Sequence, residues 1–519
     1  MKRHERVTFK AYQQDQMMLM PPSLEELVPE KHLVRVVSEV VDGLKLDLLL
    51  EQYKGGGSSS YHPRMMLKVL VYAYTQNVYT SRRIAKALRE NVHFMWLSGQ
   101  QRPDFRTVNR FRGEILRKAM EPVFASVLDL LLKRGYVRFE DYFTDGTKME
   151  ANAGRHTYVW KKAVKRYKAR VQEKAREVLR QVEEENAAED ALYGDRDLPE
   201  MEGEEVSAEE LEQKAQEIEE QLRRYGGSKR AEKAAKALRK DLIPRLRKYE
   251  QQEEMLGDRN SCSKTDPAAT FMRMNDTTVS GAPLKAGYNV QIGTENQFVL
   301  GYSVHQRPGD TGCLIPHLEQ SYRRSGRRPK NLIGDAGFGS EENYAYLVAH
   351  GIGNYLQYNT FGREQRPRHK PDPFNFENWP YDAESDTYQC PAGQLLSFKY
   401  TNKRTSQNGY QSQRRVYEAQ NCLGCSLRSQ CTRRKETNRR ITFSAHGKAL
   451  RDQARQNLTS PKGQELRSRR RTEPETVFGC IKGNRSFRRF LLRGLEKVTT
   501  EWGLLSVAHN VARMATLAV

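Results

Sequence analysis

Apolar residues near the N-terminus recur three and four positions apart, which is the spacing of amphipathic helices. A flexible stretch, KGGGSSS, divides this region into a helical segment with its linker over residues 1–60 and a helical module over residues 61–135. Ser81 and Asp104 stand where helix caps are expected. Arg and Lys on the outer face of the module would let it grip DNA, and a purely structural bundle fits the pattern equally well.

Residues 155–257 differ from their surroundings because they are rich in Lys, Arg, Glu, Gln and Ala. Such a composition is typical of long solvated helices or a helical hairpin. We interpret the segment as an insertion without chemistry of its own, whose charges form a solvated surface.

Strand-like segments flank this insertion. VRFEDYFTDG comes before it, and AGYNVQIGTEN, QFVLGYSVHQ and PKNLIGDAGF come after it, with a helix expected between the last two at residues 311–323. Three strands in hairpin-like order, a helix and a fourth strand predict a mixed α/β sheet.

Two of these strands run into an aspartate that small residues follow. Asp145 precedes Gly146 and Thr147, and Asp335 precedes AGFGS. Taken alone, each sequence is typical of a turn. In α/β sheets, however, ligands gather at strand ends, so two acids in such positions can face the same crevice.

A third acid lies in RRRTEPETVFGCIKGN. On one continuous helix, Arg471, Glu475 and Lys482 would fall within a narrow sector of one face. Thr472 and Glu475 also have the spacing of a capping box, in which the Glu only completes a helix start. Glu473 is the nearest rival for the acidic role, with poorer spacing. Two aspartates and one glutamate suffice to hold two Mg²⁺ ions for phosphodiester cleavage.

The net charge favours a polyanionic partner, because 87 Lys and Arg against 65 Asp and Glu give +22. A basic surface kept for solubility is the alternative, but the arginines are clustered, as in RSRRR and RRKETNRR. No apolar run is long enough to span a membrane, and the N-terminus lacks the apolar core of a signal peptide. We therefore expect a cytoplasmic protein that is associated with the nucleoid when bound to DNA.

Four cysteines gather in a segment at residues 360–450, which suits a metal site better than a disulfide scaffold. They have the composition of a tetrahedral Cys₄ zinc site, although the spacing is looser than in a standard ribbon. Incidental reduced cysteines are the alternative. The predicted structural Zn²⁺ ligands are Cys390, Cys422, Cys425 and Cys431.

Basic residues beside this cluster would let it touch the DNA backbone. A purely structural role, in which the metal holds the insertion together, fits the sequence equally well. These residues are Arg428, Arg433, Arg434 and Lys435. The remaining cysteines are expected to be small buried residues. They are Cys262, Cys313 and Cys480.

The chain resembles bacterial insertion-sequence transposases of the DDE class in several ordered blocks. These are FTDGTKMEANA with YVWKK, GYNVQIGTENQFVLGYSVHQRPGDT, IGDAGFGSEENY and EPETVFGCIKGNRSFRRFLLRGLEKV. The similarity is to the group whose final Glu belongs to a Tyr, Arg, Glu, Lys signature. It implies an RNase H-like catalytic domain over residues 136–519, interrupted by the charged insertion and by the Cys-rich insertion.

The same resemblance implies a role for each acid. Asp145, Asp335 and Glu475 would form the triad and hold two Mg²⁺ or Mn²⁺ ions. Arg471 and Lys482 would be the signature residues that contact DNA. The signature Tyr falls at position 468, which is a serine here, so the contact that a Tyr would make is missing.

The implied function is a transposase that binds the ends of an insertion sequence, nicks DNA and transfers the strand to target DNA. The natural expectation is a homodimer on double-stranded DNA, because two ends must be paired. One alternative is a catalytically silent DNA-binding protein or repressor derived from a transposase, which the presence of all three acids disfavours. Another is a zinc-stapled structural protein, which two strand-end aspartates disfavour.

Overall fold

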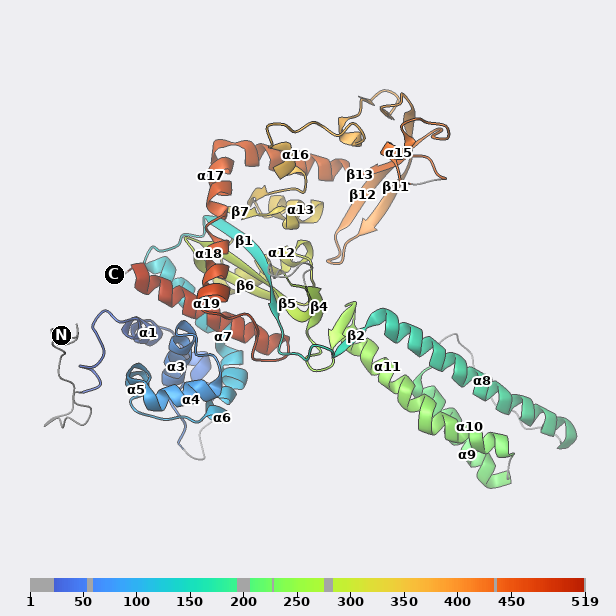
Figure 1. Cartoon of the computed structure of the whole chain (residues 1–519), viewed down its shortest axis with the longest axis horizontal. Coiled ribbons are helices and arrows are strands. Elements are labelled where there is room, and N and C mark those ends of the chain that lie inside the picture. Colours follow the sequence, from blue (N-terminus) through green and yellow to red (C-terminus); the bar gives the residue numbers. More distant parts are fainter. Residues whose placement is uncertain are drawn as a thin grey trace, which may run out of the picture.

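The computed structural model describes most of the chain and divides it into four parts: a helical module, a central sheet, a long helical arm and a smaller β lobe (Figure 1). Most of KGGGSSS, together with Arg434 and Lys435, lies outside the described residues. No helix in the described part is long and apolar enough to cross a bilayer. The described residues are 23–53, 59–193 (backbone only at 185–193), 206–225, 228–274, 283–433 and 436–517.

The N-terminal module is helical, as its spacing predicts. Asp104 caps α6, because its carboxylate accepts a hydrogen bond from the Thr107 amide at 2.7 Å. The prediction of Ser81 as a cap is wrong by one residue: the Thr80 hydroxyl caps α4 by accepting from the Arg83 amide at 3.2 Å. The helices are α1 (Leu33–Asp42), α2 (Asp47–Leu50), α3 (Pro63–Thr75), α4 (Ser81–Glu90), α5 (Val92–Ser98), α6 (Phe105–Arg110), the π-helical η2 (Phe111–Ile115) and α7 (Leu116–Lys133).

This module packs against the C-terminal helix α19 (Leu495–Leu517) around a buried polar cluster. The Tyr74 hydroxyl donates to Glu501 Oε1 at 3.0 Å, and Arg112 Nη1 donates to the Tyr74 hydroxyl at 2.9 Å. Glu501 also accepts hydrogen bonds from two backbone amides of the loop before α19. All three side chains are buried, so the cluster fixes how the module sits on the rest of the protein.

The central sheet is mixed, as predicted. Strand β5 lies between β1 on one edge and β6 and β4 on the other, and β7 and β8 follow beyond β1. β1 is antiparallel to β5 and parallel to β7, and β7 is parallel to β8. This topology is consistent with an RNase H-like DDE domain. The strands are β1 (Asp141–Glu150), β4 (Thr270–Arg273), β5 (Leu284–Glu295), β6 (Phe298–His305), β7 (Asn331–Gly334) and β8 (Gly353–Leu356).

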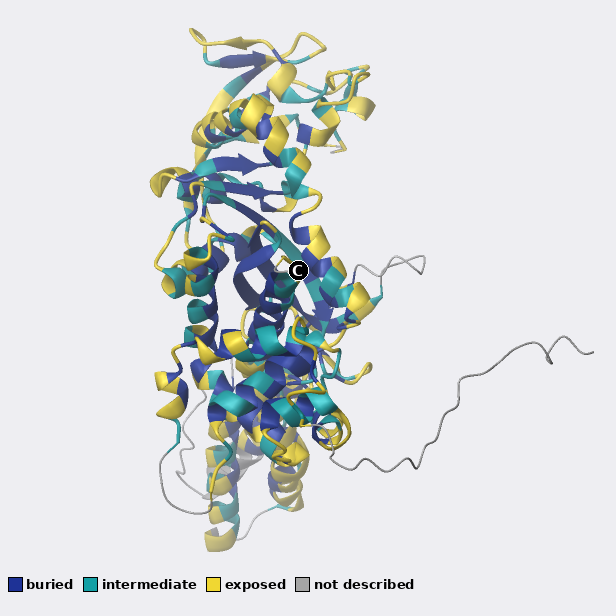
Figure 2. Cartoon of the chain, turned by 90° about the vertical axis from the view of Figure 1, so that its left-hand side faces the viewer, coloured by how far each residue is buried: buried dark blue, intermediate teal, exposed yellow. Residues whose placement is uncertain are grey.

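Helices pack on both faces of the sheet, whose strands are mostly buried (Figure 2). The apolar side chains of the sheet belong to the main hydrophobic core. On one face, the Tyr142 hydroxyl bonds to His317 of α12 at 2.8 Å, and Gly293 leaves the space that the Tyr142 ring occupies. The expected helix at 311–323 is thereby confirmed. The remaining elements around the sheet are η4 (Thr311–Cys313), α12 (Leu314–Ser325), η5 (Ala336–Phe338), α13 (Glu341–Ala349), α14 (Phe361–Glu364), α16 (Ala445–Thr459), α17 (Pro461–Arg470), α18 (Pro474–Gly479) and the π-helical η7 (Cys480–Asn484).

The charged segment between β1 and β5 forms an arm of helices that extends away from the sheet (Figure 1). The expected solvated helices are therefore present, and they enclose a small apolar core that includes Val171, Leu211 and Leu246. A short two-stranded pairing closes the base of the arm. Its elements are β2 (Tyr158–Trp160), α8 (Lys161–Tyr193), α9 (Ala208–Tyr225), α10 (Lys229–Ala237), η3 (Leu238–Leu242), α11 (Ile243–Leu256) and β3 (Ser261–Ser263).

The Cys-rich segment contains an antiparallel sheet in the order β13–β12–β11–β10–β9, which the sequence analysis did not predict. The apolar alternation that marks a half-buried strand is weak in β11, because most of its side chains are exposed. Trp379, Tyr388 and Tyr417 form the centre of the lobe. Its elements are η6 (Phe376–Asn378), β9 (Tyr381–Asp382), β10 (Thr387–Gln389), β11 (Leu395–Thr405), β12 (Gln411–Ala419), α15 (Arg428–Cys431) and β13 (Arg440–Phe443).

Candidate active site

Asp145 lies in the middle of β1, opposite Ile292 of β5, and not at the end of a strand. The expectation that the strand ends at Asp145 is wrong, because β1 stays paired with β5 as far as Glu150. The parallel pairing with β7 stops at Phe143. Asp145 therefore lies just beyond the point where β1 and β7 separate, at the C-terminal edge of β7.

Asp335 follows the last residue of β7, as predicted. Its Oδ1 accepts a hydrogen bond from the Gly337 amide at 2.9 Å, so the carboxylate starts the short η5 turn. Asp335 and Asp145 therefore reach the same edge of the sheet from two neighbouring strands.

Arg470, the last residue of α17, brings these two acids together. Its Nη2 lies 3.7 Å from Asp335 Oδ2 and 4.0 Å from Asp145 Oδ1. Only 16% of the Arg470 side chain is exposed, against 42% for Asp335, so the guanidinium is the more deeply placed partner of that pair. Arg470 is not among the site residues that the sequence predicts. Its only sequence signal is membership in the run RSRRR, which does not distinguish one arginine from the next.

The environment of Asp145 favours its protonated form. Burial raises the pKa of this carboxyl group to about 6. The Arg470 guanidinium and the Gly146 amide oppose the shift, and the negative charges of Asp335 and Asp310 add to it. Asp145 therefore lies where a second positive charge would favour ionisation of the carboxyl group.

This raised pKa predicts that Asp145→Asn stabilises the folded protein at neutral pH. An unfolded Asp ionises near pH 3.9, whereas Asp145 in the folded protein keeps its proton up to about pH 6. Stability is therefore lost as the pH rises from about 4 through 6, and the neutral amide avoids this loss. We expect the variant to be more stable by about 1–3 kcal/mol at pH 7.5 and equal to wild type near pH 4, by urea denaturation. Equal stabilities of the variant and the wild type at pH 7.5 would show that the pKa of Asp145 is not raised in the folded protein.

The helix expected to carry Arg471, Glu475 and Lys482 on one face is broken. α17 ends at Arg470, Arg471 is an exposed C-cap, and Pro474 starts the separate helix α18. Glu475 on α18 is exposed. The Lys482 ammonium group donates to Thr147 Oγ1 and, at 3.2 Å, to the carbonyl of the next residue of β1. Lys482 thus contacts the face of β1 that carries Asp145, since alternate residues of a strand share a face.

Thr472 and Glu473 lie between α17 and α18. The capping box is wrong, because the Thr472 hydroxyl donates to the Arg469 carbonyl and Glu473 is the N-cap residue of α18. Glu473 is buried, and its carboxylate accepts a hydrogen bond from the Gln297 amide at 2.7 Å. The Glu473 side chain is thus engaged at the turn between β5 and β6.

Asp310 is a further acid near the pair and is not among the site residues that the sequence predicts. Its Oδ1 accepts hydrogen bonds from Asn289 and Gln291 of β5, each at 2.8 Å. A Cβ at position 146 would lie 2.5 Å from the same oxygen, so the glycine there leaves room for it. Asp310 lies in the quoted block RPGDT, but nothing local marks it as closer to Asp145 than any other loop acid.

The four clustered cysteines line one small cavity in the β lobe. Burial raises the pKa of the Cys431 thiol; Arg439 opposes this shift and the other three cysteines add to it. Outside the cluster, Cys262 and Cys313 are buried as predicted, whereas Cys480 is half-buried. Arg428 donates to the Cys422 carbonyl at 2.7 Å, so its guanidinium braces the cluster.

Neither the pair of Asp145 and Asp335 nor the cysteine cluster has the geometry of a metal-bound site. Among the described residues, which include all the acids and cysteines considered above, no group of three or more His, Cys, Asp or Glu side chains is positioned to hold a metal ion. A metal at either place therefore requires side chains to move. The donors themselves fit, since carboxylate oxygens suit Mg²⁺ and thiolates suit Zn²⁺.

Comparison with protein families gives two matches. Residues 389–515 match the transposase DDE domain, and residues 22–114 match a transposase domain (DUF772). Each of the two matched segments is therefore similar to a part of a transposase. Together they support an insertion-sequence DDE transposase, as the resemblance indicated. The first match contains Glu475, whereas Asp145 and Asp335 lie outside both. No curated protein matches the chain.

Proposed function

We propose that the protein binds the ends of an insertion sequence and catalyses metal-dependent DNA cleavage and strand transfer at Asp145, Asp335 and Glu475. The observation that carries this proposal is the position of Arg470. A guanidinium lies within 4.0 Å of both aspartates, which come from neighbouring strands. A place that collects a positive charge between two carboxylates is suited to divalent cations.

Each acid has a distinct place in this proposal. Asp145 and Asp335 would hold Mg²⁺ or Mn²⁺ through carboxylate oxygens, and Glu475, exposed on the helix that packs against β1, would complete the set. Two bound ions would supply stabilisation of the attacking and leaving oxygens. The bound metal ions would displace Arg470 from the two aspartates, and its guanidinium would then contact a phosphate. Arg471 and Lys482 would be further phosphate contacts.

The proposed reaction needs no external energy source. In the first step, a water oxygen bonds to the phosphorus at the element end, and the bond from phosphorus to the 3′-oxygen breaks to leave a 3′-hydroxyl group. In the second step, that hydroxyl bonds to a target phosphorus, and one target phosphodiester bond breaks. One phosphodiester bond is formed for the one broken in the second step, so strand transfer is close to isoenergetic.

The test of this function uses supercoiled plasmid that carries the element ends. With Mg²⁺ we expect nicks at the ends that leave 3′-hydroxyl groups, and joined products when target DNA is added. Binding of the ends without any cleavage would instead favour a silent transposase-derived binding protein. Light scattering with and without end DNA would test the proposed homodimer on DNA.

We also propose that Cys390, Cys422, Cys425 and Cys431 bind one structural Zn²⁺. The support is that all four thiols line the same cavity. Inward movement of the thiols to Zn–S distances of about 2.3 Å would complete a tetrahedral site that fixes the lobe.

Elemental analysis tests the zinc site. We expect about one zinc per chain in the wild type, and loss of most of it in Cys422→Ser, because removal of one thiolate of four weakens the site and its folding contribution. Cys480→Ser, which changes a half-buried thiol outside the cluster, is the matched control and should keep its zinc. A metal-free wild-type protein purified without chelators would exclude the site.

A further inference from the structure

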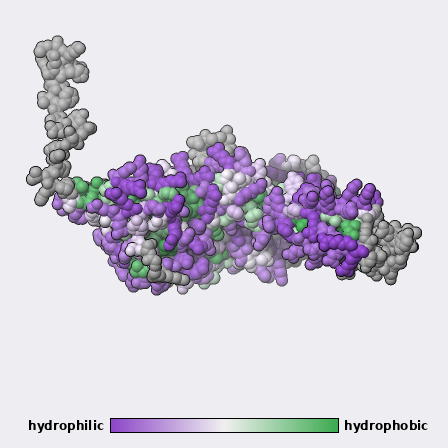
Figure 3. Space-filling model, turned by 90° about the horizontal axis from the view of Figure 1, so that it is seen from below, coloured by the Kyte–Doolittle hydropathy of each residue, from purple (hydrophilic) through white to green (hydrophobic). Residues whose placement is uncertain are grey.

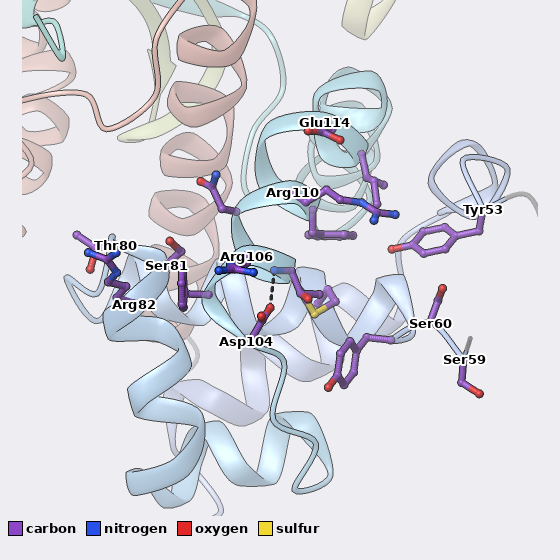
Figure 4. Close-up of a pocket in the computed structure, with 17 residues that line it drawn as sticks. Tyr53, Ser59, Ser60, Thr80, Ser81, Arg82, Asp104, Arg106, Arg110 and Glu114 are labelled. Carbon is purple, nitrogen blue, oxygen red and sulfur yellow. Dashed lines mark hydrogen bonds between the residues drawn. The ribbon is translucent and has the colours of Figure 1, made fainter. Parts of the chain in front are cut away.

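A groove of about 980 Å³ lies in the N-terminal helical module. It is bounded by the start of α4, by α6 with η2, and by the chain around residues 59–61. Figure 4 shows Arg106 and Arg110 between its two sides. The side chains labelled on those sides are Thr80, Ser81 and Arg82 on one and Tyr53, Ser59 and Ser60 on the other.

The groove carries more positive than negative charge. Arg82, Arg106 and Arg110 line it, all three are exposed, and within the described residues none of them forms an ion pair with a carboxylate. Of the two acids in the lining, Asp104 is engaged as the cap of α6, where hydrogen bonds from Thr107 hold its pKa below the usual value. Glu114 is the second acid. Three guanidinium groups are therefore exposed and form no salt bridge within the described residues, and Asp104 is the acid whose charge acts on one of them, Arg106.

An exposed aromatic ring fixes two of these cations in place. The guanidinium carbon of Arg82 lies 5.1 Å from the centroid of the Phe105 ring, and that of Arg106 lies 5.8 Å from it. Phe105 is 36% exposed. A guanidinium over a ring face keeps its N–H groups for another partner, and its side chain has less freedom to lose on binding.

The spacing of the cations suits an extended polyanion. Arg106 and Arg110 are four residues apart on α6, so they lie one above the other on the same helix face. Arg82 reaches the groove from a different helix. The groove is also large and partly open to solvent. Most of the molecular face in Figure 3 is hydrophilic. A row of cations in an open groove matches a chain of phosphates better than an enclosed small molecule.

We propose that this groove binds the sugar–phosphate backbone of double-stranded DNA at the element ends, with Arg82, Arg106 and Arg110 as the phosphate contacts and Phe105 as a positioning residue. The inference rests on the proposed function, since it assigns the end-binding surface of the same protein. Guanidinium forks match phosphate oxygens in geometry and charge. Phosphate contacts carry no base information, so the groove would position the duplex and add affinity for any sequence.

Binding at different salt concentrations tests the groove. Each phosphate contact releases counterions and adds about 0.9 to the slope of log affinity against log salt. We expect Arg82→Ala, Arg106→Ala and Arg110→Ala each to lower the slope by about 0.9, for end DNA and for scrambled duplex alike. Charge-retaining Lys variants should keep most of the slope. Phe105→Ala should weaken binding about two- to fivefold by freeing the two guanidiniums.

The experiment uses the full chain with Asp145→Asn, so that binding is measured without cleavage, by fluorescence anisotropy across a KCl series. Arg83→Ala is the matched control, because Arg83 is exposed on the same helix beside Arg82 and does not line the groove. Unchanged slopes in the three Ala variants, or an equal loss in Arg83→Ala, would overturn the proposal. If the slopes change as expected but wild type with Mg²⁺ never cleaves the ends, the proposed catalysis fails and the groove stands.

Discussion

Asp145→Asn is expected to abolish DNA cleavage while leaving the protein folded. The amide has nearly the shape of the carboxylate but loses the charge that a divalent cation requires. Stabilisation of the attacking and leaving oxygens contributes several kcal/mol, so its loss should slow cleavage at least about 1,000-fold. Quantified nicking of a plasmid with the element ends, in Mg²⁺ at pH 7.5, measures the effect.

Asp141→Asn is the matched control for this experiment. Asp141 is on the same strand and the same face, and it also pairs with an arginine of α17, since Arg469 lies 3.1 Å from its Oδ2. It accepts a hydrogen bond from Asn331 and is not paired with Arg470. We expect a change in nicking of less than about tenfold for Asp141→Asn. Equal losses for the two variants would show that any charge change on β1 disturbs the site, and would remove the evidence for a specific role of Asp145.

Arg112→Met is expected to lower the free energy of unfolding by about 3–5 kcal/mol. Arg112 is buried, donates to the Tyr74 hydroxyl and lies 3.9 Å from Glu501, which is fully buried. The methionine has a similar volume, but it leaves the Glu501 carboxylate in the protein interior without a cation. Urea denaturation at pH 7.5 measures the loss.

The control is a second ion pair between the same two parts of the chain. Arg117 of α7 pairs with Glu496 of α19, and 35% and 74% of the two side chains are exposed. Water screens such a pair, so Arg117→Met should cost no more than about 1 kcal/mol. Similar losses for Arg112→Met and Arg117→Met would mean that burial does not determine how much an ion pair contributes to the free energy of unfolding.

Local patterns predicted four strands of the central sheet, but neither the limits of all four nor the strands of the β lobe. The apolar run before Asp335, followed by small residues, predicted both the strand and the acid at its end. The same reasoning failed at Asp145, because Asp-Gly is a turn pair in isolation but β5 continues to pair with β1 beyond it. Strand pairing is a tertiary property, and no residue near position 146 encodes it.

Two residues near the acids could not be predicted from the sequence: the arginine that contacts them, Arg470, and the loop acid Asp310. Which arginine reaches the acids depends on where α17 ends, and it ends at Arg470, shortly before α18 starts at Pro474. Asp310 is brought close by the amides of Asn289 and Gln291, which lie about 20 residues earlier in the chain. A periodic pattern cannot supply such contacts, because it describes one element at a time.

Cysteine substitution of the proposed metal ligands tests the central claim most directly. A thiolate is a poor ligand for Mg²⁺ and a better one for the softer Mn²⁺, so a true ligand changed to Cys should lose cleavage in Mg²⁺ and regain part of it in Mn²⁺. We predict this response for Asp145→Cys, Asp335→Cys and Glu475→Cys, and no such metal dependence for Asp141→Cys. Cleavage by the three variants in Mg²⁺ at the wild-type rate would contradict the account.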